Sequence, residues 1–285
     1  VGDDSVLVFD AQATPTMAER VIAKVREVTD KPVSHVVLSH YHAVRVLGAP
    51  AYGAKEIVAS DAARAMIVER GEEDKASEIG RFPRLFQGAD SIRPGLTWPT
   101  TTFSHNASIW LGKREVRLMK LGRGHTAGDI VAWMPDTNVI FAGDLVEYGA
   151  TPYCGDAHFT DWPTTLDALA AFAPAAMVPG RGAALTNRAM VADGIKGTRA
   201  FLTDLYEAVK GHVAAGRSLR ETFERVHETL KPSYGDWVIF EHCLPFNVTR
   251  AYDEAGGLDH PRIWTDERDR QMWLEIGRAS CRERV

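Results

Sequence analysis

The sequence has few cysteines, no long apolar run and no concentration of basic residues. The three cysteines, Cys154, Cys243 and Cys281, show no CxxC spacing, which argues against a disulfide scaffold and against a thiolate metal site. No apolar stretch approaches the roughly 20 residues of a membrane span, and no signal peptide is visible. Lysine and arginine are scattered over a chain of net charge -5, so neither nucleic acid nor an anionic membrane is expected as a partner.

The first part of the chain alternates between strand and helix patterns. At 285 residues and 45% hydrophobic content, the chain can bury one large core or two modest ones. The predicted elements are a strand over Val6–Asp10, a helix from Thr14 to about Val28, strands over Pro32–Ser39 and Glu56–Ser60, and a helix capped by Asp61 that runs to about Glu73. This alternation is typical of an α/β fold.

The middle of the chain changes to short strands, and the last part to helices. We predict an antiparallel meander of five strands, over Thr100–Phe103, Ser108–Leu111, Glu115–Met119, Asp129–Met134 and Val139–Ala142. A helical stretch then runs from about Thr186 to Leu230 with a break near Gly216, and another helix is predicted over Trp237–Glu254.

Two histidines directly follow one predicted strand, and a third lies in a later loop. His40 and His42 come after the second strand, and His125 lies in the stretch Gly124–Asp129, which reads GHTAGD. Histidines at i and i+2 can point at one metal when the loop curls, and His125 can supply a third imidazole. Three neutral imidazoles with one open position suit a catalytic zinc ion.

An apolar strand, Asn138–Gly143, then delivers the carboxylate of Asp144 at its end. The order HxH, GHTAGD, FAGD resembles the metallo-β-lactamase superfamily of metallohydrolases. The resemblance implies a four-layer αββα sandwich, here with a helical C-terminal region, and zinc as the metal. It assigns His40, His42 and His125 to the first metal site, and Asp144 to the position that bridges two metals in relatives.

The second metal site of the family is where this sequence departs from the pattern. The family motif HxHxDH reads HYHAVR here, with Val44 in place of the aspartate and Arg45 in place of the last histidine. A later PGH-type turn reads PGR, with Arg181 in the histidine position. Only Asp144 remains of four ligands, and one carboxylate beside cationic side chains cannot hold a divalent ion. We therefore expect one metal per chain, or none.

Two of the three lost ligands are arginines. A guanidinium in this place could replace part of the missing charge, pair with Asp144, and orient a substrate carboxylate or phosphate through a bidentate contact. Arg45 and Arg181 are thus predicted to point into the space of the second metal, with at least one of them within hydrogen-bond reach of Asp144. The alternative is a decayed site in which they merely neutralise Asp144.

The resemblance implies a hydrolase that cleaves an ester, thioester, lactone or amide of a small anionic substrate. Asp144 is the best remaining general base, because position 44 offers no carboxylate, and zinc can lower the pKa of water to near 7 without one. His158 and His242 are additional candidates for a ligand or a proton shuttle. Two alternatives stay open: a non-catalytic binding or scaffold protein on a decayed metallohydrolase fold, and a redox di-iron protein, for which too few ligands can be placed.

We expect three segments: an αββα domain over residues 1–185, a helical region over 186–274 packed on it, and a non-native tail over 275–285. The chain opens on a strand without an initiator Met, so an export signal could be missing. The reducing cytoplasm is otherwise the expected compartment. The expected partner is an anionic small molecule, and a homo-oligomer is compatible with the sequence.

Overall fold

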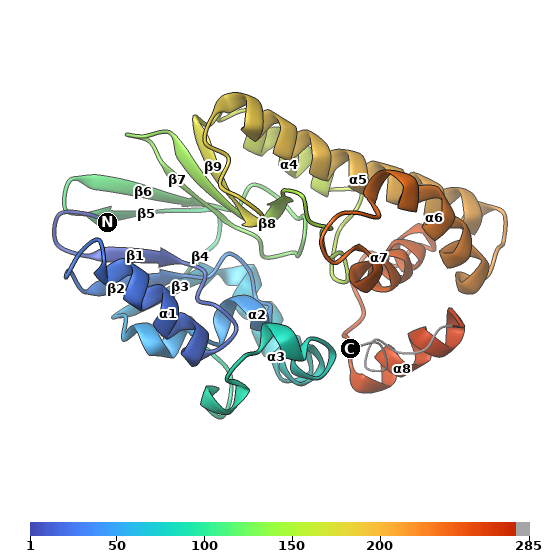
Figure 1. Cartoon of the computed structure of the whole chain (residues 1–285), viewed down its shortest axis with the longest axis horizontal. Coiled ribbons are helices and arrows are strands. Elements are labelled where there is room, and N and C mark those ends of the chain that lie inside the picture. Colours follow the sequence, from blue (N-terminus) through green and yellow to red (C-terminus); the bar gives the residue numbers. More distant parts are fainter. Residues whose placement is uncertain (278–285) are drawn as a thin grey trace. The chain divides into compact units, whose positions relative to one another are not determined.

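A computed structural model describes residues 1–277 of the chain (Figure 1). By the contacts among its residues, the chain divides into two compact units. The sheet unit comprises Val1–Leu121 and Gly128–Gly143, and the helical unit comprises Gly122–Ala127 and the chain from Asp144 onward.

The sheet unit contains a parallel sheet of four strands in the order β1-β2-β3-β4. Val36, Val37 and Val58 are buried in its two central strands, as expected for a parallel sheet covered on both faces. The strands and the two helices that connect them are β1 (Val6–Phe9), α1 (Pro15–Arg26), β2 (Val33–Val37), β3 (Glu56–Ser60), α3 (Asp61–Arg81) and β4 (Thr101–Phe103).

Both connecting helices begin at a hydroxyl side chain. The Oγ1 of Thr14 accepts the N–H of Met17 at 3.1 Å, and the Oγ of Ser60 accepts the N–H of Ala63 at 3.0 Å. Each bond satisfies a backbone donor that has no partner inside its helix. Short helical turns complete the unit, namely α2 (Ala43–Val46), η1 (Ala49–Tyr52), η2 (Pro83–Leu85) and η3 (Ala89–Ser91).

A second sheet has five strands in the order β5-β6-β7-β8-β9, and its first four strands form an antiparallel meander. In the sheet unit, Val37 and Val58 of the first sheet share one apolar core with Leu118, Ile130 and Ala132. This core between two sheets confirms the predicted α/β fold class. The strands are β5 (Asn106–Leu111), β6 (Arg114–Met119), β7 (Val131–Met134), β8 (Val139–Glu147) and β9 (Ala176–Arg181).

The helical unit confirms the predicted helical C-terminal region. Its helices are α4 (Trp162–Ala170), α5 (Arg188–Ala214), α6 (Leu219–Tyr234), α7 (Phe240–Ala255) and α8 (Asp266–Glu275). The long helix α5 contacts α4, α6 and α7. The ring of Phe201 on α5 packs against those of Tyr234 and Trp237, with centroids 5.2 and 5.9 Å apart. Ser218 and Glu221 form a capping box at the start of α6.

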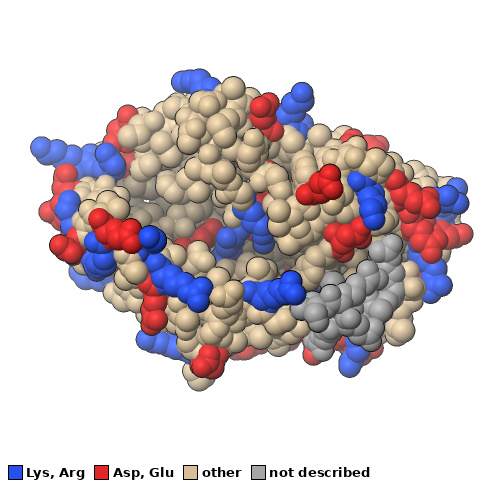
Figure 2. Space-filling model, in the orientation of Figure 1, with Lys and Arg blue, Asp and Glu red and all other residues tan. Residues whose placement is uncertain are grey.

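One face of the molecule carries both signs of charge. On the face shown in Figure 2, lysine and arginine are interspersed with aspartate and glutamate, which agrees with the scattered basic residues of the sequence. Among the helices of residues 1–277, none is long and apolar enough to cross a membrane.

Several predicted elements need correction. The helix predicted to end near Glu73 continues to Arg81, and Ser60, not Asp61, accepts the hydrogen bond that caps it. The strand predicted over Thr100–Phe103 pairs in parallel with β3 and is not part of the meander. Of the predicted tail over 275–285, residues 278–285 lie outside the described residues.

Candidate metal centre

The sheet unit brings two imidazoles together in the loop after β2. The side chains of His40 and His42 are 1% and 2% exposed, and their ring centroids lie 4.8 Å apart at an interplanar angle of 86°. The loop ends where α2 begins at Ala43, so both histidines are held between two ordered elements.

A chain of hydrogen bonds sets the tautomer of His40. The Oγ of Ser39 lies 2.9 Å from Oδ2 of Asp10 and 2.8 Å from Nδ1 of His40. A hydroxyl has one proton to donate, and an ionised carboxylate can only accept it. Ser39 therefore donates to Asp10 and accepts the Nδ1–H of His40, which leaves the lone pair of His40 on Nε2. Histidines that bind metals are oriented by such partners.

In the helical unit, an oxygen atom likewise lies next to Nδ1 of His125. Nδ1 of His125 lies 2.8 Å from the carbonyl oxygen of Tyr153, which can only accept, so the lone pair is again on Nε2. That Nε2 lies 3.7 Å from Oδ2 of Asp144, too far for a hydrogen bond. Two atoms that bind one zinc ion at about 2.0–2.1 Å each can be about this far apart. An ion bound by His125 would therefore lie beside the carboxylate of Asp144.

Asp144 shares its cationic partner with a second carboxylate. Nη1 of Arg181, at the end of β9, donates to Oδ2 of Asp144 at 3.1 Å and to Oε1 of Glu147 at 2.6 Å. Burial lowers the pKa of Arg181, but Glu147 and Asp144 raise it by more, so the pKa lies above its ordinary value. One guanidinium thus offsets part of the negative charge of both carboxylates.

Glycines of the two motifs allow close approaches within the sheet unit. Gly143, just before Asp144, has φ of +54°, and a Cβ at this position would lie 2.7 Å from Cβ of Ser39. A Cβ on Gly128 of the GHTAGD stretch would lie 2.6 Å from the backbone nitrogen of Ala63. Any other residue would displace the segments that carry the site.

The chain at positions 44 and 45 is fixed through its backbone. The N–H of Val44 donates to Oε2 of Glu78 at 3.0 Å, and the carbonyl oxygen of Arg45 accepts the N–H of Ala11 at 2.7 Å. The predicted direction of the Arg45 side chain stays a prediction. For Arg181, the contact with Asp144 is the one that the sequence predicts, whereas its part in catalysis is still a proposal.

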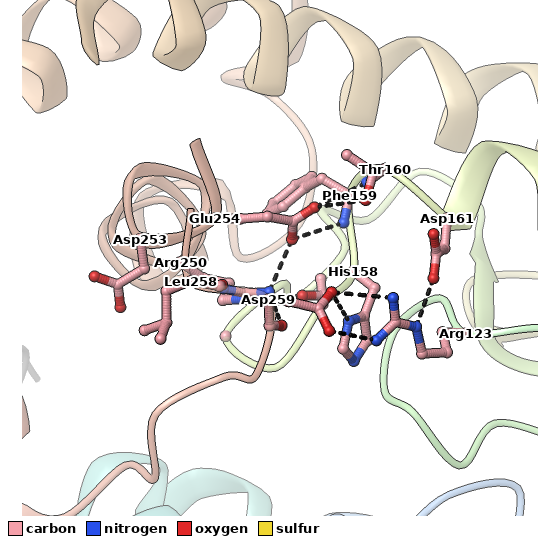
Figure 3. A network of polar contacts seen from close by, with 12 residues as sticks. Arg123, His158, Phe159, Thr160, Asp161, Arg250, Asp253, Glu254, Leu258 and Asp259 are labelled. Carbon is pink, nitrogen blue, oxygen red and sulfur yellow. Dashed lines mark hydrogen bonds and ion pairs between the residues drawn. The ribbon is translucent and has the colours of Figure 1, made fainter. Parts of the chain in front are cut away.

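A polar network in the helical unit surrounds His158 (Figure 3). Arg123 donates from Nη1 and Nη2 to both oxygens of Asp259, at 2.8 and 3.0 Å, and from Nε to Asp161 at 2.5 Å. Nδ1 of His158 lies 3.8 Å from Oδ1 of Asp259. Burial first, and then the positive charges of Arg123 and Arg250, lower the pKa of His158 to about 4. The imidazole is therefore neutral at pH 7.

His158 and His242 are the additional histidines that the sequence proposes. Within residues 1–277, neither belongs to a group of three side chains that could hold a metal. The backbone N–H of His158 donates to the carbonyl oxygen of Gly124 at 2.9 Å, so it supports the loop that carries His125. As ligands or proton shuttles, both stay predictions.

The buried carboxylates that the sequence did not predict include Asp74, Glu78, Glu147 and Asp156. Asp74 and Glu78 stand at i and i+4 of one helix, which shows that they share a face but not what that face contacts. Glu147 follows Asp144 by three residues on a strand, where alternation places such residues on opposite faces. No pattern in the sequence therefore pairs it with Asp144.

His40 and His42 in the sheet unit and His125 in the helical unit are buried, and each offers one ring nitrogen. Asp74 in the sheet unit and Asp156 in the helical unit are also buried, and each offers a carboxylate oxygen. Zinc takes both kinds of ligand atom, so the chemistry of these side chains fits a zinc ion.

Comparisons with known proteins agree on one family. The chain is 21% identical over 258 residues to a linear primary-alkylsulfatase of Pseudomonas sp., covering 78% of this chain and 48% of that protein. It is 34% identical over 93 residues to a type 2 metallo-beta-lactamase of Bacteroides fragilis, covering 31% of this chain and 37% of that protein. The chain thus spans about half, or less, of the length of these curated relatives.

Solved structures show the same fold. The stereoselective inverting sec-alkylsulfatase from Pseudomonas sp. matches with a TM-score of 0.71 at 14% identity, over 99% of this chain and 51% of that one. A metallo-beta-lactamase from Pontibacter korlensis matches with a TM-score of 0.56 at 18% identity, over 71% of this chain and 84% of that one. The family model of the metallo-beta-lactamase superfamily matches residues 1–181, and the chain belongs to this superfamily.

Proposed function

We propose that the protein is a hydrolase that uses one zinc ion, held by His40, His42 and His125 with Asp144 beside it. The observation behind the proposal is an oxygen atom 2.8 Å from Nδ1 in two of these histidines, the Ser39 hydroxyl for His40 and the Tyr153 carbonyl for His125. If each Nδ1–H donates to this oxygen, each ring offers the Nε2 lone pair that a metal needs. When bound, zinc would supply Lewis-acid activation at its open position.

The side chains around this site have separate proposed roles. Asp144 is the general base, because its carboxylate faces His125 at 3.7 Å and is oriented by Arg181. Arg181 holds Asp144 and Glu147 and replaces part of the charge of a second metal. Arg45 is proposed to orient the anionic group of the substrate through a bidentate contact.

The proposed reaction is hydrolysis of an ester, thioester, lactone or amide of a small anionic substrate. The relatives named above include an alkylsulfatase and metallo-beta-lactamases, which are hydrolases. A sulfate ester is therefore one of the esters to test first, and the cytoplasm is the compartment that we propose.

Zinc content tests the proposal. We expect about one zinc per chain after purification from zinc-supplemented medium, since three of four ligands of the second site of the family are replaced. His42→Ala should lose the ion, whereas His105→Ala, an exposed histidine of the same unit, should keep it. Two zinc ions per chain would overturn the single-metal proposal and point to Asp74 and Asp156 as further ligands.

The non-catalytic alternative has one observation in its favour. The guanidinium of Arg181 already pairs with Asp144 and Glu147, as expected for a decayed site in which an arginine has neutralised the remaining carboxylates. A folded protein that takes up no zinc would support this alternative. An activity screen over acyl, lactone, amide and sulfate substrates, with and without a chelator, separates a metal-dependent hydrolase from a binding protein.

A further inference from the structure

Helix α3 buries a row of charged side chains along one face. Arg70, Asp74, Glu78 and Arg81 are each no more than 4% exposed, and their spacing of four, four and three residues places them on one side of the helix. Charged side chains are almost never buried to this extent unless other groups compensate them. The contacts of this face therefore need an explanation other than apolar packing.

Two of these carboxylates hold the segment that follows His42. The N–H of Ala43 donates to Oδ2 of Asp74 at 3.3 Å, and the N–H of Val44 donates to Oε2 of Glu78 at 3.0 Å. These are the first two N–H groups of α2, which have no acceptor within that helix, and the side chain of His42 caps neither. Helix α3 thus fixes the backbone at the position where the loop itself lacks a carboxylate.

Asp74 also lies beside the ring of His42. One carboxylate oxygen of Asp74 and one ring nitrogen of His42 lie within 4.8 Å of each other. Both carboxylates therefore hold the backbone, and Asp74 in addition lies within 4.8 Å of a ring nitrogen of His42.

We propose that Asp74 supplies, from α3, the carboxylate that position 44 lacks. Its charge makes His42 a better zinc ligand, and its hydrogen bond to Ala43 holds the loop of His40 and His42. A carboxylate behind a metal-binding histidine raises the basicity of that histidine, and its loss weakens metal binding by about 10–100-fold. Asp74 is thus a positioning residue, and its role rests on the proposed zinc site.

Asp74→Asn separates charge from hydrogen bonding. The amide oxygen of asparagine can still accept the N–H of Ala43, while the negative charge is gone. Glu73→Gln is the matched control, because Glu73 is exposed and precedes Asp74 on the same helix. Asp74→Glu restores the charge, and Glu78→Gln removes the charge of the other carboxylate that holds the backbone.

The measurement is the zinc dissociation constant, obtained by competition with a chromophoric chelator, together with the Tm of the metal-stripped protein. We expect Asp74→Asn to bind zinc about 10–100-fold more weakly with a Tm near that of wild type. Asp74→Glu should recover most of the zinc affinity. Glu78→Gln should lose less zinc affinity than Asp74→Asn, and Glu73→Gln should bind zinc as tightly as wild type. If Asp74→Asn does not fold, Asp74→Ser, which also keeps an oxygen acceptor, takes its place.

The outcomes distinguish this inference from the function on which it rests. A wild-type protein that folds without binding zinc overturns the proposed function and the role of Asp74 with it. A wild type with one zinc, and an Asp74→Asn variant whose affinity equals that of Glu73→Gln, overturns the role of Asp74 alone. Equal losses in Asp74→Asn and Glu78→Gln would also overturn it, because the effect would then be loop order and not charge at His42.

Discussion

Removing the guanidinium of Arg181 should destabilise the protein, because two buried carboxylates depend on it. The side chains of Asp144 and Glu147 are 2% and 0% exposed, and both accept from Nη1 of Arg181. Removing one partner of a buried ion pair costs about 3–5 kcal/mol. The Arg181 side chain is 23% exposed, so water offsets part of this loss, and we expect Arg181→Ala to cost about 2–3 kcal/mol at neutral pH.

Urea unfolding followed by tryptophan fluorescence measures this change in the free energy of unfolding. Arg199→Ala is the control, because Arg199 pairs with Asp167 on the surface, where the side chains are 32% and 72% exposed, and its loss should cost less than about 1 kcal/mol. Adding Glu147→Gln to Arg181→Ala removes one of the two buried charges and should restore part of the stability. Free energies of unfolding of Arg181→Ala and Arg199→Ala within about 0.5 kcal/mol of each other would show that the two buried carboxylates do not depend on Arg181.

Two further predictions concern stability and use the same assay. The pKa of His158 is about 4 in the folded state and 6.5 in the unfolded state. The contribution of its neutral imidazole to the free energy of unfolding is therefore complete above pH 6.5 and is lost as the pH falls toward 4. Between pH 7 and pH 4, the free energy of unfolding of wild type should therefore fall by about 3 kcal/mol more than that of His158→Gln. Equal decreases would show that burial does not lower the pKa of His158. Gly143→Ala should cost about 2–4 kcal/mol, because its Cβ meets Ser39 at a positive φ, whereas Gly216→Ala, with positive φ but open space around it, should cost about 1 kcal/mol.

The strand and helix patterns predicted most of the fold, and helix α3 shows where they fail. Its apolar periodicity fades after Ile67, so the sequence predicts an end near Glu73, yet the helix continues to Arg81. The second half buries charged side chains, which a hydropathy pattern assigns to solvent. The tertiary contacts of Asp74 with Ala43 and of Glu78 with Val44 are part of what covers that face.

The same limit applies to the candidate site. Short motifs predicted the contact between Arg181 and Asp144, because each motif fixes a strand end and the loop that follows it. The assignment of the histidines as ligands stays a prediction. Asp74 and Glu147 were missed, because their roles depend on which segments pack together at long range. The predicted pairing of strand β4 was wrong for a related reason. Its sequence fits a strand, but nothing in the local sequence shows that it pairs with β3 and not with the meander.

Zinc K-edge X-ray absorption on the purified wild-type protein shows whether histidines hold a single zinc ion. We predict about one zinc per chain with imidazole nitrogen ligands at about 2.0–2.1 Å and no neighbouring metal. His125→Ala should lose this signal together with the zinc. A second metal at about 3.5–4 Å, or a folded wild-type protein that binds no zinc, would contradict it.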